Sequence, residues 1–169
     1  MRVDRYFAFV DLCDFTRYTD VNGDEKAVAV LTSFRAAARE ICSDHGVRVA
    51  KWLGDGAMFV STEPPRLVCC ILALKRRVEE LEVALPLRAG LAGGAVILFE
   101  GDDYIGGPVN LAARLCDLAA PRELLACAEL GDVVPADATA SDTGSREIAG
   151  FADPVDVVRI EASPVVASQ

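Results

Sequence analysis

The chain has 169 residues, a formal net charge of −9 and a hydrophobic content of 52%. This length fits one domain with a full core and is too short to expect two. The acidic balance argues against a nucleic-acid partner, because neutralising a phosphate backbone takes a basic surface. No apolar run approaches the ~18 residues of a membrane span, and the N-terminus does not resemble a signal peptide. We therefore expect a cytoplasmic protein with no membrane partner.

Cysteine and histidine usage limits the possible chemistry further. The six cysteines show no C-x-x-C spacing, which favours buried free thiols over a zinc site or a disulfide framework. The only histidine, His45, directly precedes Gly46 at the end of a helical pattern, where it would face the helix dipole. With one histidine, the sequence therefore argues against metal binding by several imidazoles and against Ser-His catalysis.

The first part of the chain predicts a buried strand followed by a long helix. Residues 5–12, "RYFAFVDL", are nearly unbroken in aromatic and branched side chains, as in a central strand buried on both faces. After a short loop, Asn22 and Glu25 have the spacing of a capping box, and apolar residues then recur at helical intervals as far as Gly46. The pattern predicts a helix between these points.

A hairpin, a second helix and two further strands follow. "VRVAKWL" and "AMFVS" are short strands joined by "GDG", which is a strong hairpin signal. The segment after "EPP" has apolar residues on one helical stripe, and residues 86–92 and 95–99 are strand candidates. The order strand, helix, strand, strand, helix, strand is that of the ferredoxin-like βαββαβ arrangement. It places the first strand beside the hairpin in one antiparallel sheet.

The remaining chain extends this α+β core by a further helix and C-terminal strands. "GPVNLAARLCDLAAP" predicts a helix that starts at Pro108 and stops at Pro121, "ELLACAEL" predicts a strand, and "REIAGFADPVDVVRIEA" predicts a closing hairpin. We expect one domain over residues 1–162 and a flexible tail over residues 163–169.

Two acids fall where strands of this layout meet. Asp11 ends the first strand and Asp55 lies in the turn of the neighbouring hairpin, so the pair would suit one or two hard divalent cations. Asp-Gly is also what a hairpin turn prefers, which leaves a purely structural role open for Asp55. An acid after an apolar strand costs desolvation unless it is paired, and taken together the two acids favour a metal site.

Other polar residues are weaker signals. The loop "LCDFTRY", which includes Phe15 and Thr16, can offer backbone N–H groups to a phosphate, although it lacks the glycines of a Walker loop. Lys51 shares a strand row with Val47, Val49 and Leu53, so it would point toward a core or a pocket if those residues face inward, although a lysine on a strand is more often a solvated edge residue. On the later helix one polar stripe is formed by Asn110, Arg114 and Asp117.

Three segments in order resemble the signature blocks of the class III nucleotidyl cyclase catalytic domain. They are "FVDLCDFT", "KWLGDGAMFVS" and "DYIGGPVNLAARL", and the resemblance spans roughly residues 5–160. It implies synthesis of a cyclic nucleotide by a head-to-tail homodimer with shared active sites. It also implies two divalent cations, Mg²⁺ or Mn²⁺, held by Asp11, Asp55 and the backbone of Leu12.

The same resemblance implies roles for the remaining residues. Asn110 and Arg114 match the asparagine and arginine that orient the ribose and stabilise the transition state, and Phe15 and Thr16 fall at the phosphates. Lys51 and Asp103 occupy the base-reading positions with the pair seen in adenylate cyclases, so the implied substrate is ATP. A lysine can donate to a ring nitrogen of adenine, and a carboxylate accepts from its amine.

Two positions depart from the family pattern. Asp14 stands where the family commonly has glycine, and the segment "IAGFAD" lacks the late phosphate-binding lysine, for which Arg146 is a candidate substitute. These departures keep open a catalytically weak or silent nucleotide-binding or dimerisation module. A guanylate cyclase is a third reading, disfavoured by the residues at the base-reading positions.

Overall fold

The structure is a computed structural model that describes residues 1–164. In this part of the chain one eight-stranded sheet runs in the order β2-β3-β1-β4-β6-β8-β7, and the short β5 pairs with β4. The strands are β1 Arg2–Leu12, β2 Arg48–Leu53, β3 Gly56–Ser61, β4 Leu87–Phe99, β5 Asp103–Ile105, β6 Leu124–Cys127, β7 Ala138–Arg146 and β8 Val155–Ala162. The helices are α1 Phe15–Asn22, α2 Asp24–His45, α3 Pro64–Glu79, α4 Gly107–Leu118 and the 3-10 helix η1 Ala128–Val133.

The first four long strands confirm the ferredoxin-like prediction. β1 lies between β3 and β4 and is antiparallel to both, and β2 pairs with β3 as the hairpin signal predicted. The extension is joined through one parallel pairing, β4 with β6, so the complete sheet is mixed whereas its core is antiparallel. The predicted closing hairpin is longer than expected, because β7 begins at Ala138.

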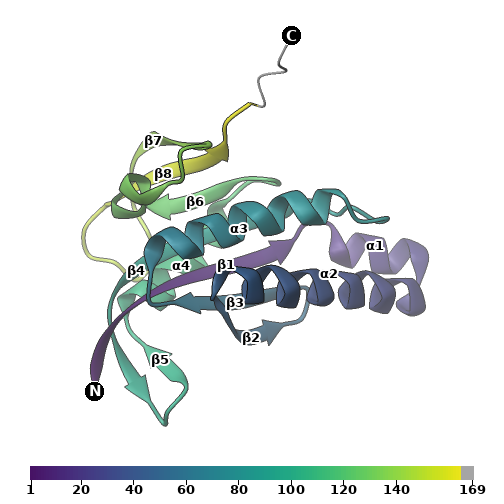
Figure 1. Ribbon diagram of the computed structural model, residues 1–169, viewed down its shortest axis with the longest axis horizontal. Coiled ribbons are helices and arrows are strands. Elements are labelled where there is room, and N and C mark those ends of the chain that lie inside the picture. Colours follow the sequence, from purple (N-terminus) through teal and green to yellow (C-terminus); the bar gives the residue numbers. More distant parts are fainter. Residues whose placement is uncertain (165–169) are drawn as a thin grey trace.

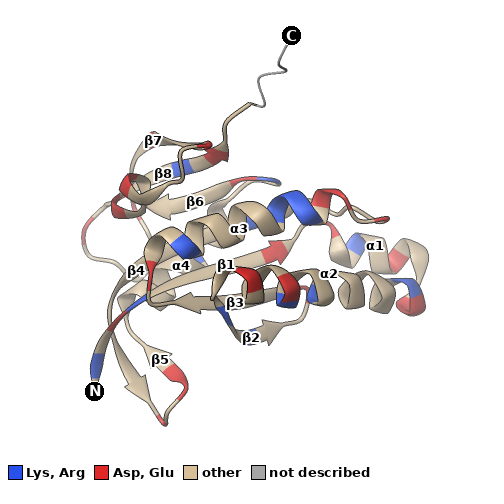
Figure 2. Cartoon of the chain, in the orientation of Figure 1, with Lys and Arg blue, Asp and Glu red and all other residues tan. Residues whose placement is uncertain are grey.

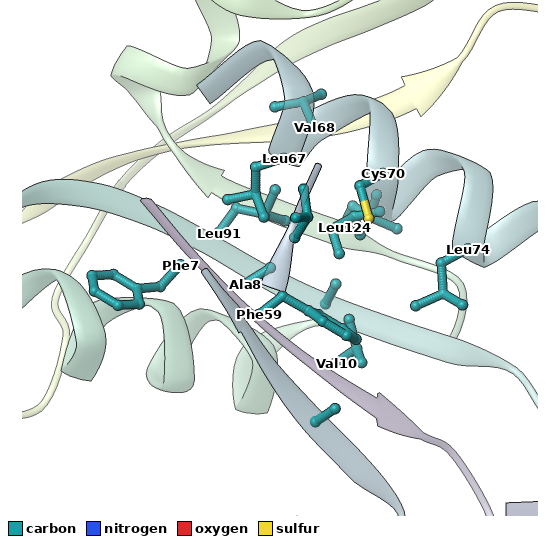
Figure 3. Packing of buried hydrophobic residues seen from close by; sticks show 14 of the residues in the cluster. Phe7, Ala8, Val10, Phe59, Leu67, Val68, Cys70, Leu74, Leu91 and Leu124 are labelled. Atoms are coloured by element: carbon teal, nitrogen blue, oxygen red, sulfur yellow. The ribbon is translucent and has the colours of Figure 1, made fainter. Parts of the chain in front are cut away.

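Helices cover both faces of the sheet. Figure 1 shows α2 and α3 in front of the strands and α4 behind them. Ala8 and Val10 point toward α3 residues such as Leu67, whereas Phe7 points away from them (Figure 3). Because strand side chains alternate, Asp11 shares the face of Phe7, which is the face covered by α4. The core therefore buries β1 on both sides, as its apolar run predicted.

Three details of the sequence-based layout were wrong. Residues 86–92 and 95–99 form one continuous strand, β4, in which Gly93 lies against the ring of Tyr6 instead of ending the strand. The expected loop after β1 contains a helix, α1. Asn22 ends α1, and α2 begins after Gly23 without a side-chain cap, so the capping box does not form.

The expectation of a flexible tail over 163–169 concerns mainly residues 165–169, which lie outside the described residues. Of the six cysteines all are free, four are buried, and Cys13 and Cys69 are half-buried. Among residues 1–164 there is no helix long and apolar enough to cross a membrane.

Candidate active site

The two acids predicted to bind metal lie beside each other at one end of the sheet. Asp11 is opposite Gly56 in the β1–β3 pairing, and Asp55 immediately precedes β3 in the hairpin turn. The Leu12 backbone N–H donates to the carbonyl oxygen of Asp55 at 3.1 Å, which fixes the turn against the end of β1. Figure 2 shows acidic colour at this end of β1. The predicted meeting of strand end and hairpin turn is thus present in the fold.

The close approach of two carboxylates changes their protonation. Partial burial, followed by the hydrogen bond and the negative charge of Asp11, raises the pKa of Asp55 from 3.8 to about 6. Two neighbouring oxygen ligands of this kind suit a hard divalent cation, which would compensate both negative charges. Among the described residues no group of three or more His, Cys, Asp and Glu side chains gathers, so a bound cation would need backbone, water or substrate oxygens as well.

Arg88 is a site residue that the sequence analysis missed. It lies directly opposite Asp11 on β4, and its Nη2 donates to Asp11 Oδ2 at 3.1 Å. Its Nη1 donates to the carbonyl oxygen of Asp117 near the end of α4 at 3.0 Å. The available signal was a charged side chain inside the apolar strand "LPLRAGLAGG", the same signal that singled out Asp11.

These charges line an open cleft of about 580 Å³. Phe15 and Thr16 form the first turn of α1 at its edge. N–H groups in the first turn of a helix have no intrahelical partner and favour an anion. Arg17 and Arg88 are the basic residues among the described residues that line the cleft, and Arg146 is not one of them.

Asp14 occupies a backbone conformation that glycine adopts more readily than other residues. Its φ of 63° and ψ of 14° are left-handed, and it immediately precedes α1. Aspartate tolerates this conformation better than most residues, because its short side chain can bond locally. Asp14 also lines the cleft, so its carboxylate adds negative charge beside Asp11 and Asp55.

The predicted base-reading residues meet on the surface. Lys51 of β2 donates through Nζ to Asp103 Oδ1 of β5 at 2.8 Å, and the backbone N–H of Tyr104 donates to the same oxygen at 3.0 Å. These two bonds lower the pKa of Asp103 and keep it ionised. A bulge between Val49 and Lys51 breaks the row that the two residues were expected to share, and the lysine reaches Asp103 of β5.

Asn110 and Arg114, like the pair Lys51 and Asp103, are predicted site residues that the fold of one chain does not bring into the cleft of the two acids. Both are exposed on α4, four residues apart, and neither lines the cleft of Asp11 and Asp55. α4 itself is held against β4, because Gly90 leaves no room for a side chain between strand and helix. The two polar groups therefore present one fixed face outward.

No protein-family model matches the chain, but curated proteins and solved structures resemble it. The chain is 39% identical over 156 residues to the uncharacterized protein Rv2212 of Mycobacterium tuberculosis, covering 92% of this chain and 41% of that protein. It is 31% identical over 158 residues to a pH-sensitive adenylate cyclase of the same species, covering 90% of this chain and 39% of the relative. The chain thus spans about two-fifths of the length of these relatives.

Solved structures share nearly the whole fold. The adenylyl cyclase CyaB from P. aeruginosa superposes with a TM-score of 0.81 at 22% identity, covering 98% of this chain and 97% of that one. The guanylate cyclase domain of RhGC from Catenaria anguillulae, solved in complex with GTP, has a TM-score of 0.85 at 16% identity and coverage of 97% and 100%.

The fold is therefore that of the adenylyl and guanylyl cyclase catalytic domains. The chain has the fold of the class III nucleotidyl cyclase catalytic domains, and the resemblance inferred from its three sequence blocks is confirmed.

Proposed function

We propose that this chain is an adenylate cyclase domain that converts ATP to 3′,5′-cyclic AMP and pyrophosphate as a head-to-tail homodimer. The observation that carries the proposal is the pair Asp11 and Asp55, held side by side at a cleft edged by a helix N-terminus. The relatives named adenylate cyclase support the choice of reaction.

The residues present fit two divalent cations, Mg²⁺ or Mn²⁺. Asp11, Asp55 and the backbone of Leu12 would hold them, since adjacent carboxylates provide the hard oxygen ligands that such ions prefer. Cations bound there would acidify the ribose 3′-hydroxyl and neutralise charge on the phosphates. The carboxylate of Asp14 adds a further negative charge to the same cleft, so the activity should be measured with Mg²⁺ and with Mn²⁺ separately.

This chain's own groups would bind and orient the triphosphate. The first-turn N–H groups of Phe15 and Thr16 lie at the cleft and favour an anion, and the guanidinium of Arg88 can donate its remaining N–H groups to phosphate oxygens. Charge develops on the α-phosphate during in-line attack, and the guanidinium of Arg114 would stabilise it there, while Asn110 would orient the ribose. Arg146 at the end of β7 stays a candidate for the late phosphate-binding position.

A second copy of the chain would complete the site. Asn110 and Arg114 face outward away from the acids of their own chain, so each site would combine the acids of one chain with the helix of its partner. Apolar side chains on the projecting β4–β5 hairpin support such an association: Ile97 and Phe99 are 48% exposed and Ile105 is 51% exposed. Figure 1 shows this hairpin extending beyond the helices.

ATP is favoured as the substrate by the Lys51–Asp103 pair, which offers a donor and an acceptor to the base. The same two side chains could bind guanine if the donor and the acceptor exchanged places, so GTP is the second candidate substrate. A silent nucleotide-binding module is the third, motivated by Asp14 and by the missing late lysine.

The test is formation of 3′,5′-cyclic AMP and pyrophosphate from ATP by purified protein, with Mg²⁺ and separately with Mn²⁺. Asp11→Ala serves as the blank, and GTP is offered in parallel. Metal-dependent product that disappears in the variant supports the proposal. A folded dimer that gives no cyclic product with either metal and either nucleotide would leave the silent module as the better description.

A further inference from the structure

Two bridges join β2 to β5, although β5 has no sheet pairing with β2 among the described strands. One is the bond from Lys51 to Asp103, and the other runs from Arg48 Nη2 to the hydroxyl of Tyr104 at 2.9 Å. Arg48 and Lys51 are three residues apart, a spacing that would place them on opposite faces of a regular strand. The bulge after Val49 re-aims the strand so that both reach β5.

Tyr104 is fixed at three points. Its ring meets the fully buried Phe7 edge to face, with centroids 5.3 Å apart and planes at 68°. The guanidinium of Arg48 lies 5.8 Å from the ring centroid in addition to donating to the hydroxyl. The backbone N–H of Tyr104 then donates to Asp103 Oδ1. A rigid Tyr104 therefore determines which way the neighbouring carboxylate faces.

The direction of the Lys51–Asp103 pair matters because adenine and guanine present opposite patterns. Adenine has a donor at position 6 beside an acceptor at position 1, whereas guanine has an acceptor at position 6 beside a donor. Within residues 1–164, Asp103 Oδ1 takes both bonds and Oδ2 takes none, while the Lys51 ammonium uses one of its three N–H groups. The Asp103 carboxylate would therefore accept from the position 6 amine of adenine while Lys51 donates to position 1. For guanine the two side chains would have to exchange places, with Lys51 at position 6 and Asp103 at position 1.

The ion pair cannot hold that order alone. Its side chains are 49% and 45% exposed, and an exposed pair of this kind is weak and readily rearranged. The partly buried Tyr104, clasped by Arg48 and packed on Phe7, is the rigid part of the cluster.

We propose that Tyr104 and Arg48 are positioning residues that set base selectivity by fixing the order of Asp103 and Lys51. The inference rests on the proposed function, because it takes a purine nucleotide as the ligand of that pair. Loss of the hydrogen bond between Arg48 and the Tyr104 hydroxyl should reduce the discrimination between ATP and GTP and leave the fold, Asp11 and Asp55 unchanged.

The experiment measures binding of 3′-deoxy-ATP and 3′-deoxy-GTP, which lack the attacking hydroxyl and cannot cyclise, by calorimetry with Mg²⁺. Tyr104→Phe removes the hydroxyl and keeps the ring on Phe7, and Arg48→Met removes the other partner. Arg66→Met is the matched control, because Arg66 makes a surface ion pair with Glu63 on α3. A lost hydrogen bond of this kind should reduce the adenine-over-guanine affinity ratio about 5-fold in each variant.

The wild type should prefer the adenine analogue, the Arg66 variant should keep the ratio, and the double variant should fall no further than either single one. An unchanged ratio in both single variants, even with a lowered melting temperature, would assign a purely structural role and overturn the inference. A wild type without preference would overturn it as well. A wild type that binds selectively but forms no cyclic product would sink only the proposed reaction.

Discussion

Asp11 and Arg88 carry opposite charges into an otherwise apolar part of the sheet, on neighbouring strands and in register. Their side chains are 31% and 26% exposed, so the ion pair is partly shielded from solvent. Asp55 adds a second carboxylate to one guanidinium, and this excess of negative charge is what a divalent cation would balance. Three residues therefore set the charge balance of the site: Asp11 at the end of β1, Asp55 in the β2–β3 turn and Arg88 on β4.

Replacing Asp11 by asparagine should lower the pKa of Asp55 from its value of about 6. The asparagine amide can donate to the Asp55 carboxylate, and the neighbouring negative charge is gone, although burial still holds the pKa up. Carbon-detected NMR titration of the Asp55 carboxyl measures this pKa in both proteins. Asp24→Asn on the exposed start of α2 is the control and should leave that pKa unchanged. An equal or higher Asp55 pKa in the Asp11 variant would contradict the geometry.

The same shift has a consequence for stability. The folded chain binds more protons than the unfolded chain between pH 3.8 and about 6, so stability falls as pH rises through this interval. The Asp11 variant should show a smaller fall in its urea midpoint across this range.

Sequence reasoning reached some site residues and missed others for identifiable reasons. Asp11 and Asp55 were accessible because an acid at the end of an apolar strand and a hairpin turn are both local patterns. Arg88 was missed because its partner is 77 residues away, and only the β1–β4 register brings them together. The αL conformation of Asp14 likewise cannot be deduced from a single sequence.

At the scale of elements, contact between β4 and α4 fixes the helix that carries Asn110 and Arg114. A Cβ built on Gly90 would lie 2.2 Å from both the carbonyl oxygen of Ala112 and the backbone nitrogen of Cys116. Both are backbone atoms, so the helix itself would have to move.

Gly90→Ala should therefore destabilise the domain by about 1–3 kcal/mol, the usual range for overpacking a filled site. Urea denaturation measures this, and any remaining activity should fall further than stability predicts because Asn110 and Arg114 move with the helix. Gly131→Ala is the control, since a Cβ there would meet side-chain atoms no closer than 3.4 Å. A Gly90 variant within about 0.5 kcal/mol of the wild type would show that α4 is not held this tightly.

The elements missed by sequence reasoning are those with weak periodicity. α1 has eight residues and none is buried, so no apolar stripe reveals it. β5 has three residues and is specified by its pairing with β4. Gly93 and Gly94 looked like a break between strands, whereas Gly93 is required because the ring of Tyr6 would lie 2.1 Å from a Cβ. The long helices and the hairpin were predictable because their patterns repeat over many residues.

At the scale of the whole molecule, the proposed shared site makes a specific prediction for mixed chains. Asp11→Ala and Asn110→Ala chains should each be inactive, but random mixing gives about half mixed dimers, each with one intact site of two. Recovery should approach about one quarter of wild-type activity.

The control mixes Asp11→Ala with Asp55→Ala. Both acids of a site come from one chain in the proposed dimer, so these mixed dimers contain no intact site and should stay inactive. Differently tagged chains verify that mixed dimers form. Equal recovery in both mixtures, or no recovery from a verified Asp11 and Asn110 mixture, would argue against sites shared in this way.

The position of β4 in the sheet also governs when the chain can fold during synthesis. β1 pairs along its whole length with β4, from Arg2 opposite Ile97 to Leu12 opposite Leu87. A nascent chain must therefore hold β1 without this partner until β4 has also been made, and such long-range pairing is slow. Chaperone demand should consequently concentrate in the interval between emergence of β1 and emergence of β4 from the ribosome.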